Sequence, residues 1–468
     1  MSDQTPPIEP GGAPDKGPEP DKGGVLPVHP DALRADREVV GSDVTQQPLA
    51  KQPEPLRKRS LGQAFLDELW ADNAFTVTLL AIVLAAIVGA VLMVLGDEPT
   101  RQQWAYFFYQ PGKTLSASWD LVSAAYANMF KGSIVDPDTF NRWIWGVDDV
   151  TWQRVMYPVS ETLTFAAPLI FTGLASALPF RAGLFNIGGQ GQAIMGAVGG
   201  ATVGFAFAAP GATAWILSII VGALFGGIYG LIVGVLKART GAHEVIVTIM
   251  MNYIAVYFLG WYILQSGVHD PARSDAISKP VHPQAMFPKI FGPTASDAGL
   301  RANLGIVLAL LAAWGVSWLL RRGTFGFELR AVGYNQDAAR TAGMSVGLTL
   351  ALTMGLAGAL AGLGGVTMVH GDARALSVDV VGQIGFNGIL VALLGRVKPW
   401  GVVWAGLLFG AMTAGGLRMQ ADPGISTELV TVIQALIVMF VAAPMLVKAI
   451  FRLRKSPSSA AHVGLAQG

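Results

Sequence analysis

Uncharged polar side chains clustered inside apolar runs are the residues of this chain best suited to bind a ligand. Asn186, Gln190 and Gln192 stand among three glycines where an apolar run begins. Glycine-rich breaks at membrane depth can turn backbone groups toward a cavity, and side-chain amides pair with hydroxyls and ring nitrogens. The cluster therefore predicts a site for an uncharged, hydroxyl-rich solute. The alternative is close helix packing, in which the amides bond across helices.

Two further polar clusters are placed to join the same site. Glu244, Thr248 and Asn252 recur every four residues, so they share one face of a helix. Gln383 and Asn387 lie in a short apolar segment and have the same spacing. Helix packing is an equally open explanation for each of these two clusters. We predict that all three clusters line one path for a solute: Asn186, Gln190, Gln192, Glu244, Thr248, Asn252, Gln383 and Asn387.

The sequence offers no set of residues for covalent or metal chemistry. It contains no cysteine, no HExxH zinc motif and no Walker lysine loop. We therefore expect no catalytic residue, no metal site and no ATP hydrolysis by this chain. A path lined mainly by amides also has nothing to neutralise a phosphate, so phosphorylated solutes should not pass.

A polar stretch at 326–346 carries a second kind of candidate site. Arg321 and Arg322 precede it, and short loops rich in Lys and Arg favour the cytosol. We expect two short helices, one ended by Gly333 and one capped by Asn335 and ended by Gly343 in a left-handed conformation. A surface-lying amphipathic connector is the alternative. The residues expected to meet a cytosolic partner are Glu328, Arg330, Gly333, Asn335, Asp337, Ala338, Ala339 and Gly343.

The composition requires a membrane protein. Of 468 residues, 52% are hydrophobic and only 13% are charged, which is far from a soluble domain. We expect an all-α polytopic fold of about ten transmembrane or re-entrant helices, with Val381–Leu394 too short to span without tilting, breaking or re-entering. The expected spans are Phe75–Leu95, Pro158–Phe180, Ile187–Ala208, Ala214–Leu236, Val245–Leu264, Leu304–Leu320, Leu348–Val369, Val381–Leu394, Val402–Leu417 and Glu428–Val447.

The segments outside the main apolar region divide by composition. Residues 1–58, rich in Pro, Gly, Asp and Lys, predict a disordered cytosolic tail. Residues 59–156 hold the first span and an external segment with short interfacial helices, 157–447 form the main transmembrane domain, and 448–468 form a basic cytosolic tail. Both termini are thus expected inside. The net charge of +1 argues against a nucleic-acid partner, whereas membrane lipid must surround the spans.

Charged residues are almost absent from the expected spans. Glu161 and Glu428 fall near external ends, where we expect their side chains to reach the surface, and Glu244 lies at an inner border. Ion-coupled carriers usually place charged groups within the membrane to bind the driving ion. The pattern therefore disfavours an ion-coupled secondary carrier, which remains the alternative from another class, with a non-transport scaffold a more distant third.

Four motifs resemble one family of transporters. They are FRAGLFNIGGQGQAIMGA at Phe180–Ala197, HEVIVTIMMNYIA at His243–Ala255, ELRAVGYNQDAARTAGMSV at Glu328–Val346 and FNGILVALLGRVKPWGVVWAG at Phe386–Gly406. Together they resemble ABC importer permeases of the branched-chain amino acid, ribose and simple-sugar superfamily, most closely the nucleoside branch. The likeness covers about Glu161–Val447 in matching order.

The resemblance implies a type II-like ABC permease in a bacterial plasma membrane that imports nucleosides or, alternatively, ribose or another simple sugar. It implies four partners: an ABC ATPase that holds ATP and Mg, a second similar permease, an extracytoplasmic substrate-binding lipoprotein, and a small-molecule solute. The chain itself would bind no cofactor, and Glu328–Val346 would dock on the ATPase. Two positions depart from the family, which usually has an acid at the position of Gln190 and a proline at that of Gln336.

Overall fold

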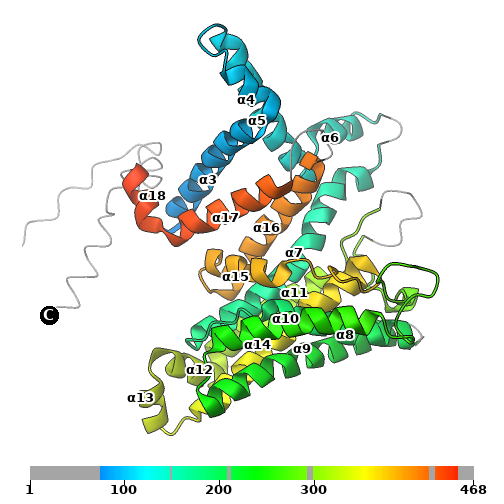
Figure 1. The fold of residues 1–468 in the computed structure, drawn as a ribbon, viewed down its shortest axis with the longest axis vertical. Helices are drawn as coiled ribbons and strands as arrows, with labels where there is room; N and C mark the ends of the chain where they lie inside the picture. Colours follow the sequence, from blue (N-terminus) through cyan, green and yellow to red (C-terminus); the bar gives the residue numbers. More distant parts are fainter. Residues whose placement is uncertain (1–73, 148–149, 208–211, 292–298, 421–426, 452–468) are drawn as a thin grey trace, which may run out of the picture. The chain divides into compact units, whose positions relative to one another are not determined.

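Helices account for the regular structure of this chain. The structure is a computed structural model that describes residues 74–147, 150–207, 212–291, 299–420 and 427–451. Within these ranges every regular element is a helix, and only three isolated β-bridges occur, between loop residues (Figure 1). The predicted all-α fold is thus confirmed. The predicted tail at 1–58 and most of the tail at 448–468 lie outside the described residues.

The described helices run from α3 to α18 in chain order, with two short non-α turns among them. They are α3 (Ala74–Gly96), α4 (Glu98–Trp104), α5 (Pro111–Ser133), α6 (Pro137–Ile144), α7 (Trp152–Arg181), α8 (Gly189–Ala206), α9 (Thr213–Thr240), α10 (Glu244–Ile263), the 3-10 turn η1 (Pro283–Ala285), α11 (Leu304–Arg322), α12 (Thr324–Tyr334), α13 (Gln336–Thr341), α14 (Val346–Met368), the π-helical turn η2 (Val369–Ala373), α15 (Ile384–Leu394), α16 (Pro399–Gln420), α17 (Thr427–Ala442) and α18 (Pro444–Phe451).

Nine of the ten expected spans each correspond to one helix, whereas the tenth, Glu428–Val447, is divided between α17 and α18. In the described part of the chain, seven helices are long and apolar enough to cross a membrane: α3, α7, α9, α10, α11, α14 with η2, and α16. The pair α17 and α18, bent by 90°, makes an eighth if it counts as one span. The two remaining helices are the glycine-rich α8 and the 11-residue α15, whose shortness agrees with the expected break. The protein is therefore a multi-pass membrane protein.

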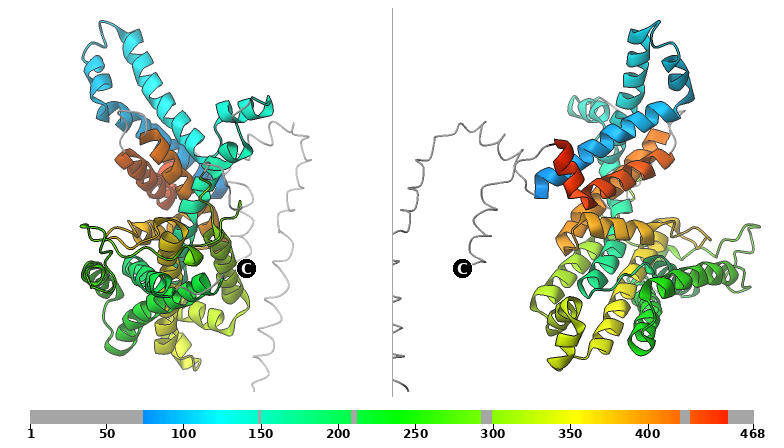
Figure 2. Two further views of the ribbon diagram at one scale, coloured as in Figure 1. Left: turned by 90° about the vertical axis from the view of Figure 1, so that its right-hand side faces the viewer. Right: turned by 60° about the vertical axis from the view of Figure 1, so that its left-hand side comes forward.

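The segment predicted to be external differs from the expectation of short helices. Helices α4 and α6 are short, but α5 runs for 23 residues and packs along α16 (Figure 2). Its contacts explain its length, since the Tyr126 hydroxyl donates a 2.6 Å hydrogen bond to Ala86 O on α3. A Cβ on Gly132 would lie 2.7 Å from Arg418 Cβ on α16, so the two helices approach closely. Tertiary packing thus extends this helix.

Glycines bring three helix backbones into direct contact. On α9, Gly222, Gly226, Gly230 and Gly234 recur every four residues and form one face, which packs on α14. A Cβ at Gly226 would lie closer than 3.0 Å to Gly358 O. A Cβ at Gly230 of α9 would also lie closer than 3.0 Å to Met354 O, and a Cβ at Gly196 of α8 would be as close to the backbone of Gly362. Small residues allow such close helix packing in membranes, where burial of apolar surface drives association only weakly.

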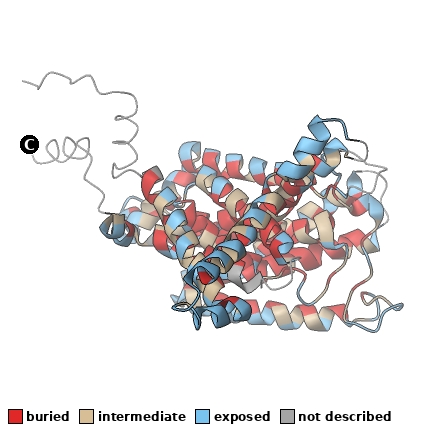
Figure 3. Ribbon diagram, turned by 90° about the horizontal axis from the view of Figure 1, so that it is seen from above, coloured by how far each residue is buried: buried red, intermediate tan, exposed pale blue. Residues whose placement is uncertain are grey.

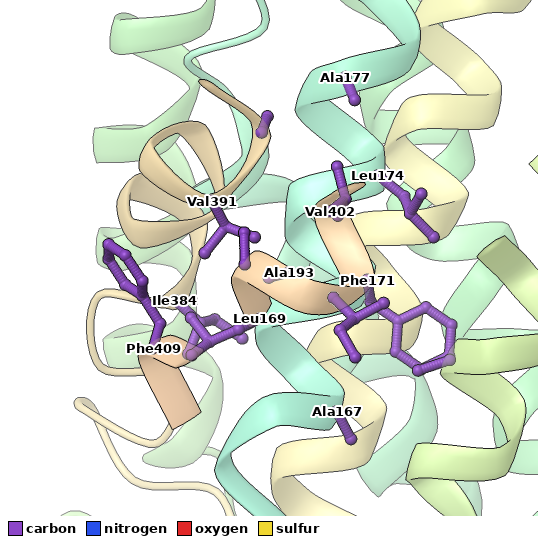
Figure 4. Close-up of a cluster of buried hydrophobic side chains, with 14 of the residues drawn as sticks. Ala167, Leu169, Phe171, Leu174, Ala177, Ala193, Ile384, Val391, Val402 and Phe409 are labelled. Carbon is purple, nitrogen blue, oxygen red and sulfur yellow. The ribbon is translucent and has the colours of Figure 1, made fainter. Parts of the chain in front are cut away.

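Larger side chains fill the space around α7. Figure 4 shows Leu169 and Phe171 of α7 with Val391 of α15 and with Val402 and Phe409 of α16, all buried. Exposed residues lie mainly on the outer helix faces (Figure 3). A chain segment too short to span the membrane, α15, is thereby held between two longer helices.

The glycine contacts predict a position-dependent effect of added volume. Gly226→Val should insert a branched side chain into the α14 backbone and destabilise the protein by about 3 kcal/mol or more. Gly260→Val on α10 is the matched control, because a Cβ there meets nothing within 4 Å. Membrane yield and thermal unfolding of the purified variants would be compared. Equal losses for both variants would contradict this role of the α9 glycine face.

Candidate functional site

The first turn of α8 is the centre of the predicted polar path. Asn186 and Gln192 bond to each other in both directions, with Asn186 Nδ2 donating to Gln192 Oε1 at 2.9 Å and Gln192 Nε2 donating to Asn186 Oδ1 at 3.1 Å. Asn186 Nδ2 also donates to Ala175 O, and its Oδ1 accepts from Gly188 N. Both side chains are buried. This pair closes the turn that joins α7 to α8.

Two more amides tie α8 to its neighbours. Gln190 Nε2 donates to Gly382 O, and its Oε1 accepts from Gly385 N at 3.0 Å, which links α8 to the start of α15. Asn252 on α10 accepts from Gly191 N at 2.8 Å and donates to Ile187 O at 3.0 Å. The three sequence clusters therefore meet at one junction. Their four buried amides are already satisfied by protein groups, as the packing alternative expects.

The remaining members of the second cluster also have partners. Thr248 is buried and donates to Glu244 O of its own helix at 2.8 Å. The Glu244 carboxylate pairs with Lys237 Nζ at 2.9 Å across the turn between α9 and α10. Lys237 thus neutralises Glu244 at the predicted inner border, so Glu244 adds no unpaired charge to the predicted path.

Gln383 and Asn387 differ from the buried amides. Gln383 is exposed at the N-cap of α15, and Asn387 is half-buried one turn later. Among the described residues, neither side chain has a hydrogen-bond partner, so both keep their full capacity for a ligand. Phe386, 42% exposed, stands beside them at i+3 from Gln383. Phe386 was not among the predicted site residues, although its helical spacing from Gln383 was a usable signal.

A charged cluster at the opposite ends of these helices was also missed. Arg301, in the loop before α11, contacts Glu161 Oε2 at 2.7 Å and pairs with the Asp372 carboxylate of η2. Ser160 Oγ accepts from Arg301 N at 2.7 Å. Glu161 was expected to reach the surface, but its side chain is only 7% exposed because Arg301 pairs with it inside the fold. Residue spacing alone could not reveal a contact that spans 140 residues.

The electrostatics of this cluster favour the charged guanidinium. Burial alone would lower the pKa of Arg301, but the hydrogen bond to Asp372 and the charges of Glu161 and Asp372 raise that pKa above its ordinary value. The cluster joins α7, the loop before α11 and the end of α14 through one cation. Arg301 thus holds three segments together on the predicted external side.

The region predicted to be cytosolic forms two helices, α12 and α13. Asn335 caps α13 as predicted, since its Oδ1 accepts from Asp337 N at 2.9 Å and from Ala338 N at 3.0 Å. Gly343 has a φ of +82°, the left-handed conformation expected after this helix. Gly333 does not end α12; the helix continues to Tyr334. Its lack of a side chain instead lets α12 approach Arg181 O at the end of α7, where a Cβ would be closer than 3.0 Å.

Burial divides the predicted contact residues of this region. Val332 and Ala339 are buried and anchor α12 and α13 to the bundle, so Ala339 presents no surface to a partner. Glu328, Arg330 and Gly333 are half-buried. The exposed members of the predicted set are Asn335, Asp337, Ala338 and Gly343, beside the 91% exposed Tyr334. Gln336, one of the two departures, is exposed at the first position of α13.

The long apolar helices of the bundle define a multi-pass membrane protein. Residues 159–442 match the family described as "Branched-chain amino acid transport system / permease component". The match covers more than half of the chain, and the chain therefore belongs to this family. Membership of a permease-component family sets aside the ion-coupled carrier and the scaffold.

Curated relatives share most of their length with this chain. It is 41% identical over 289 residues to a guanosine ABC transporter permease of Bacillus subtilis, covering 62% of this chain and 82% of the relative. It is 36% identical over 314 residues to a nucleoside ABC transporter permease of Lactococcus lactis (65% and 85%). It is 31% identical over 300 residues to a glucose ABC transporter permease of Haloferax volcanii (63% and 79%). No solved structure gives a significant match.

The charged cluster of Arg301, Glu161 and Asp372 predicts a specific loss of stability. Arg301→Met should leave the buried Glu161 carboxylate without its cation and lower the free energy of unfolding by about 3 kcal/mol. Arg273→Met is the matched control, because its pair with Asp275 is about half exposed and should matter little. Thermal unfolding of the purified proteins would compare them. If Arg301→Met and Arg273→Met unfolded alike, the three-segment role of Arg301 would be refuted.

Proposed function

We propose that this chain is the permease subunit of an ATP-driven importer for nucleosides. The observation that carries the proposal is the similarity, over most of their length, to permeases named for guanosine and for nucleosides. The chain would form the translocation path, while a separate ABC ATPase would bind ATP and Mg. A second similar permease and an extracytoplasmic substrate-binding lipoprotein complete the assembly. Both termini are proposed to be cytosolic, on the side of the basic ends of α7 and α11.

Import of a simple sugar such as glucose or ribose is the second candidate. It is supported by the 31% identity to a permease named for glucose. Hydroxyl recognition by amides would serve either solute, so the two candidates share most of the proposed chemistry. An aromatic side chain beside the amides favours the nucleoside, since a base can stack on a ring face.

The exposed face of α15 is the proposed contact surface for the solute. Gln383, Phe386 and Asn387 present an amide, an aromatic ring and a second amide within about one helical turn. The ring would stack on the base, and the amides would bond to ribose hydroxyls or base edges. The buried amides at Asn186, Gln190, Gln192 and Asn252, with Glu244 and Thr248, would shape this path by holding α8, α10 and α15 together. No cation on this face would neutralise a phosphate.

Transport of labelled solutes tests this proposal. Cells carrying the whole operon should take up nucleosides but not nucleoside monophosphates, and uptake should fail on ATP depletion while surviving collapse of ion gradients. Asn387→Ala should reduce uptake about tenfold to a hundredfold at normal yield, because a ligand hydrogen bond is lost. Asn252→Ala is the matched comparison and should instead lower protein yield. Efficient ribose or glucose uptake without nucleoside uptake would replace the proposed solute with a sugar.

The exposed tip of α12 and α13 is the proposed contact with the ATPase. Val332 and Ala339 pack the two helices onto the bundle, and Gly333 seats α12 against the end of α7. A displacement of this tip would therefore be transmitted to α7, α11 and α14. Closure of the ATPase on ATP would move Asn335, Asp337 and Ala338, with Arg330 and Glu328 at the edge, and shift the path between inward and outward states. Solute would shift this equilibrium only by its differential affinity for the two states.

Gly343 allows a test of coupling that leaves packing unchanged. A Cβ at Gly343 meets nothing within 4 Å, so any effect of substitution comes from its positive φ. Gly343→Val should distort the end of α13 and abolish solute-stimulated ATP hydrolysis by the purified complex, with the protein still in the membrane. Gly343→Asn is the matched control, because asparagine tolerates this conformation, and it should keep most of the activity. Full stimulation of Gly343→Val would show that the tip does not couple.

A further inference from the structure

A basic cavity lies at the inner ends of the membrane helices, apart from the proposed path. It has a volume of about 340 Å³ and is lined by Arg181 at the end of α7, Arg321 in the last turn of α11, Arg330 of α12 and Lys398 before α16. No carboxylate is among its lining residues. Four cations around one small cavity repel one another unless an anion lies between them.

Among the described residues, the four cations have no anionic partner. In the described ranges, none of them pairs with a carboxylate, whereas Lys131, Lys237, Arg301 and Arg418 all do. Arg181 Nε donates to Val397 O at 3.1 Å, and Arg321 bonds to Ser317 of its own helix. These bonds to neutral acceptors orient the guanidinium groups but leave their charge uncompensated. The cavity is therefore built to receive a negative charge.

The start of α16 adds to the positive field. Trp400 and Gly401 line the cavity from the first turn of this 22-residue helix, where backbone N–H groups have no preceding helical carbonyl. The turn before it is unusual, because Arg396 and Val397 have φ values of 53° and 56°. A β-branched residue rarely adopts this conformation. Arg181 holds the turn through Val397 O, and the turn presents Lys398 to the cavity.

An apolar groove continues from the basic cavity. It has a volume of about 280 Å³ and shares Lys398 and Gly401 with the cavity. Its further lining is mostly apolar and includes Leu394, Trp404 and Leu408, with Arg396 and Thr78 as its other polar residues. Trp404 is 73% exposed, on a helix long and apolar enough to span the membrane. A soluble anion would use only the basic part. A molecule with a phosphate and an acyl chain would use both parts.

We propose that this cavity and groove bind one anionic phospholipid of the inner leaflet, with its phosphate among Arg181, Arg321, Arg330 and Lys398 and an acyl chain along Trp404 and Leu408. Basic pockets between membrane helices on the cytosolic side suit such headgroups. The lipid would bridge α7, α11, α12 and α16 and so join the spans to the cytosolic helices. This inference does not depend on which solute the protein imports.

Lipid binding to the purified full-length protein tests the proposal. Phosphatidylglycerol and phosphatidylcholine with matched chains would be titrated in detergent, with bound lipid counted by native mass spectrometry. Phosphatidylglycerol should bind at least tenfold more tightly, and less tightly at high salt. The double variant Arg321→Gln with Lys398→Gln should weaken phosphatidylglycerol by about thirtyfold. Arg239→Gln, an exposed cation at the end of α9 outside the cavity, should change nothing.

Two further arms separate the lipid from other ligands. The charge-preserving variant Arg321→Lys with Lys398→Arg should retain binding, which distinguishes lost charge from misfolding. Glycerol 3-phosphate should not displace phosphatidylglycerol at equal concentration, because it has no acyl chain for the groove. Equal binding of both lipids, or displacement by glycerol 3-phosphate, would overturn the proposal. A third outcome would also overturn the proposal: the double Gln variant binds lipid normally but loses the ATPase from the purified complex. The cavity would then hold an acidic segment of a partner protein.

Discussion

Direct contact between the backbones of α8, α9 and α14 is the constraint on which the rest of this structure depends. Glycines at 196, 226 and 358 leave no room for a Cβ between these helices. Since lipid is as apolar as a buried side chain, such close contact must replace the hydrophobic effect as a source of helix association. The position of α8 relative to α14 then fixes where its first turn meets α10 and α15.

Polar groups within this packed frame serve mainly to hold segments together. The side-chain amides at the start of α8 make hydrogen bonds to backbone groups of the turn, which lie outside any regular helix. Such backbone groups need a protein partner where water is absent. The same rule explains why Gln190 bonds to both Gly382 and Gly385. Among the described residues of the three predicted polar clusters, Gln383 and Asn387 are the two whose side chains have no hydrogen-bond partner. The three predicted polar clusters thus separate, in the fold, into buried side chains that hold helices together and two side chains beside α15 that have no protein partner.

Charges are sorted toward the two ends of the bundle. At one end, Arg301 is enclosed by two carboxylates, and at the other, four cations share a cavity without a carboxylate. The first arrangement is complete within the chain. The second is the cavity proposed to bind an anionic phospholipid, whose phosphate would supply the negative charge that its lining lacks.

The sequence by itself determined the membrane class, the helical fold, the approximate positions of the apolar helices and the cap at Asn335, because these follow from local composition and from hydrogen bonds between near neighbours. It also indicated that the stretch at 381–394 is too short to span. It could not decide whether Asn186 faces a solute or a neighbouring helix, that Gly333 packs against α7 rather than ending α12, or that Glu161 meets Arg301. Those outcomes depend on contacts between residues far apart in the chain, and only the packing of the helices brings such residues together.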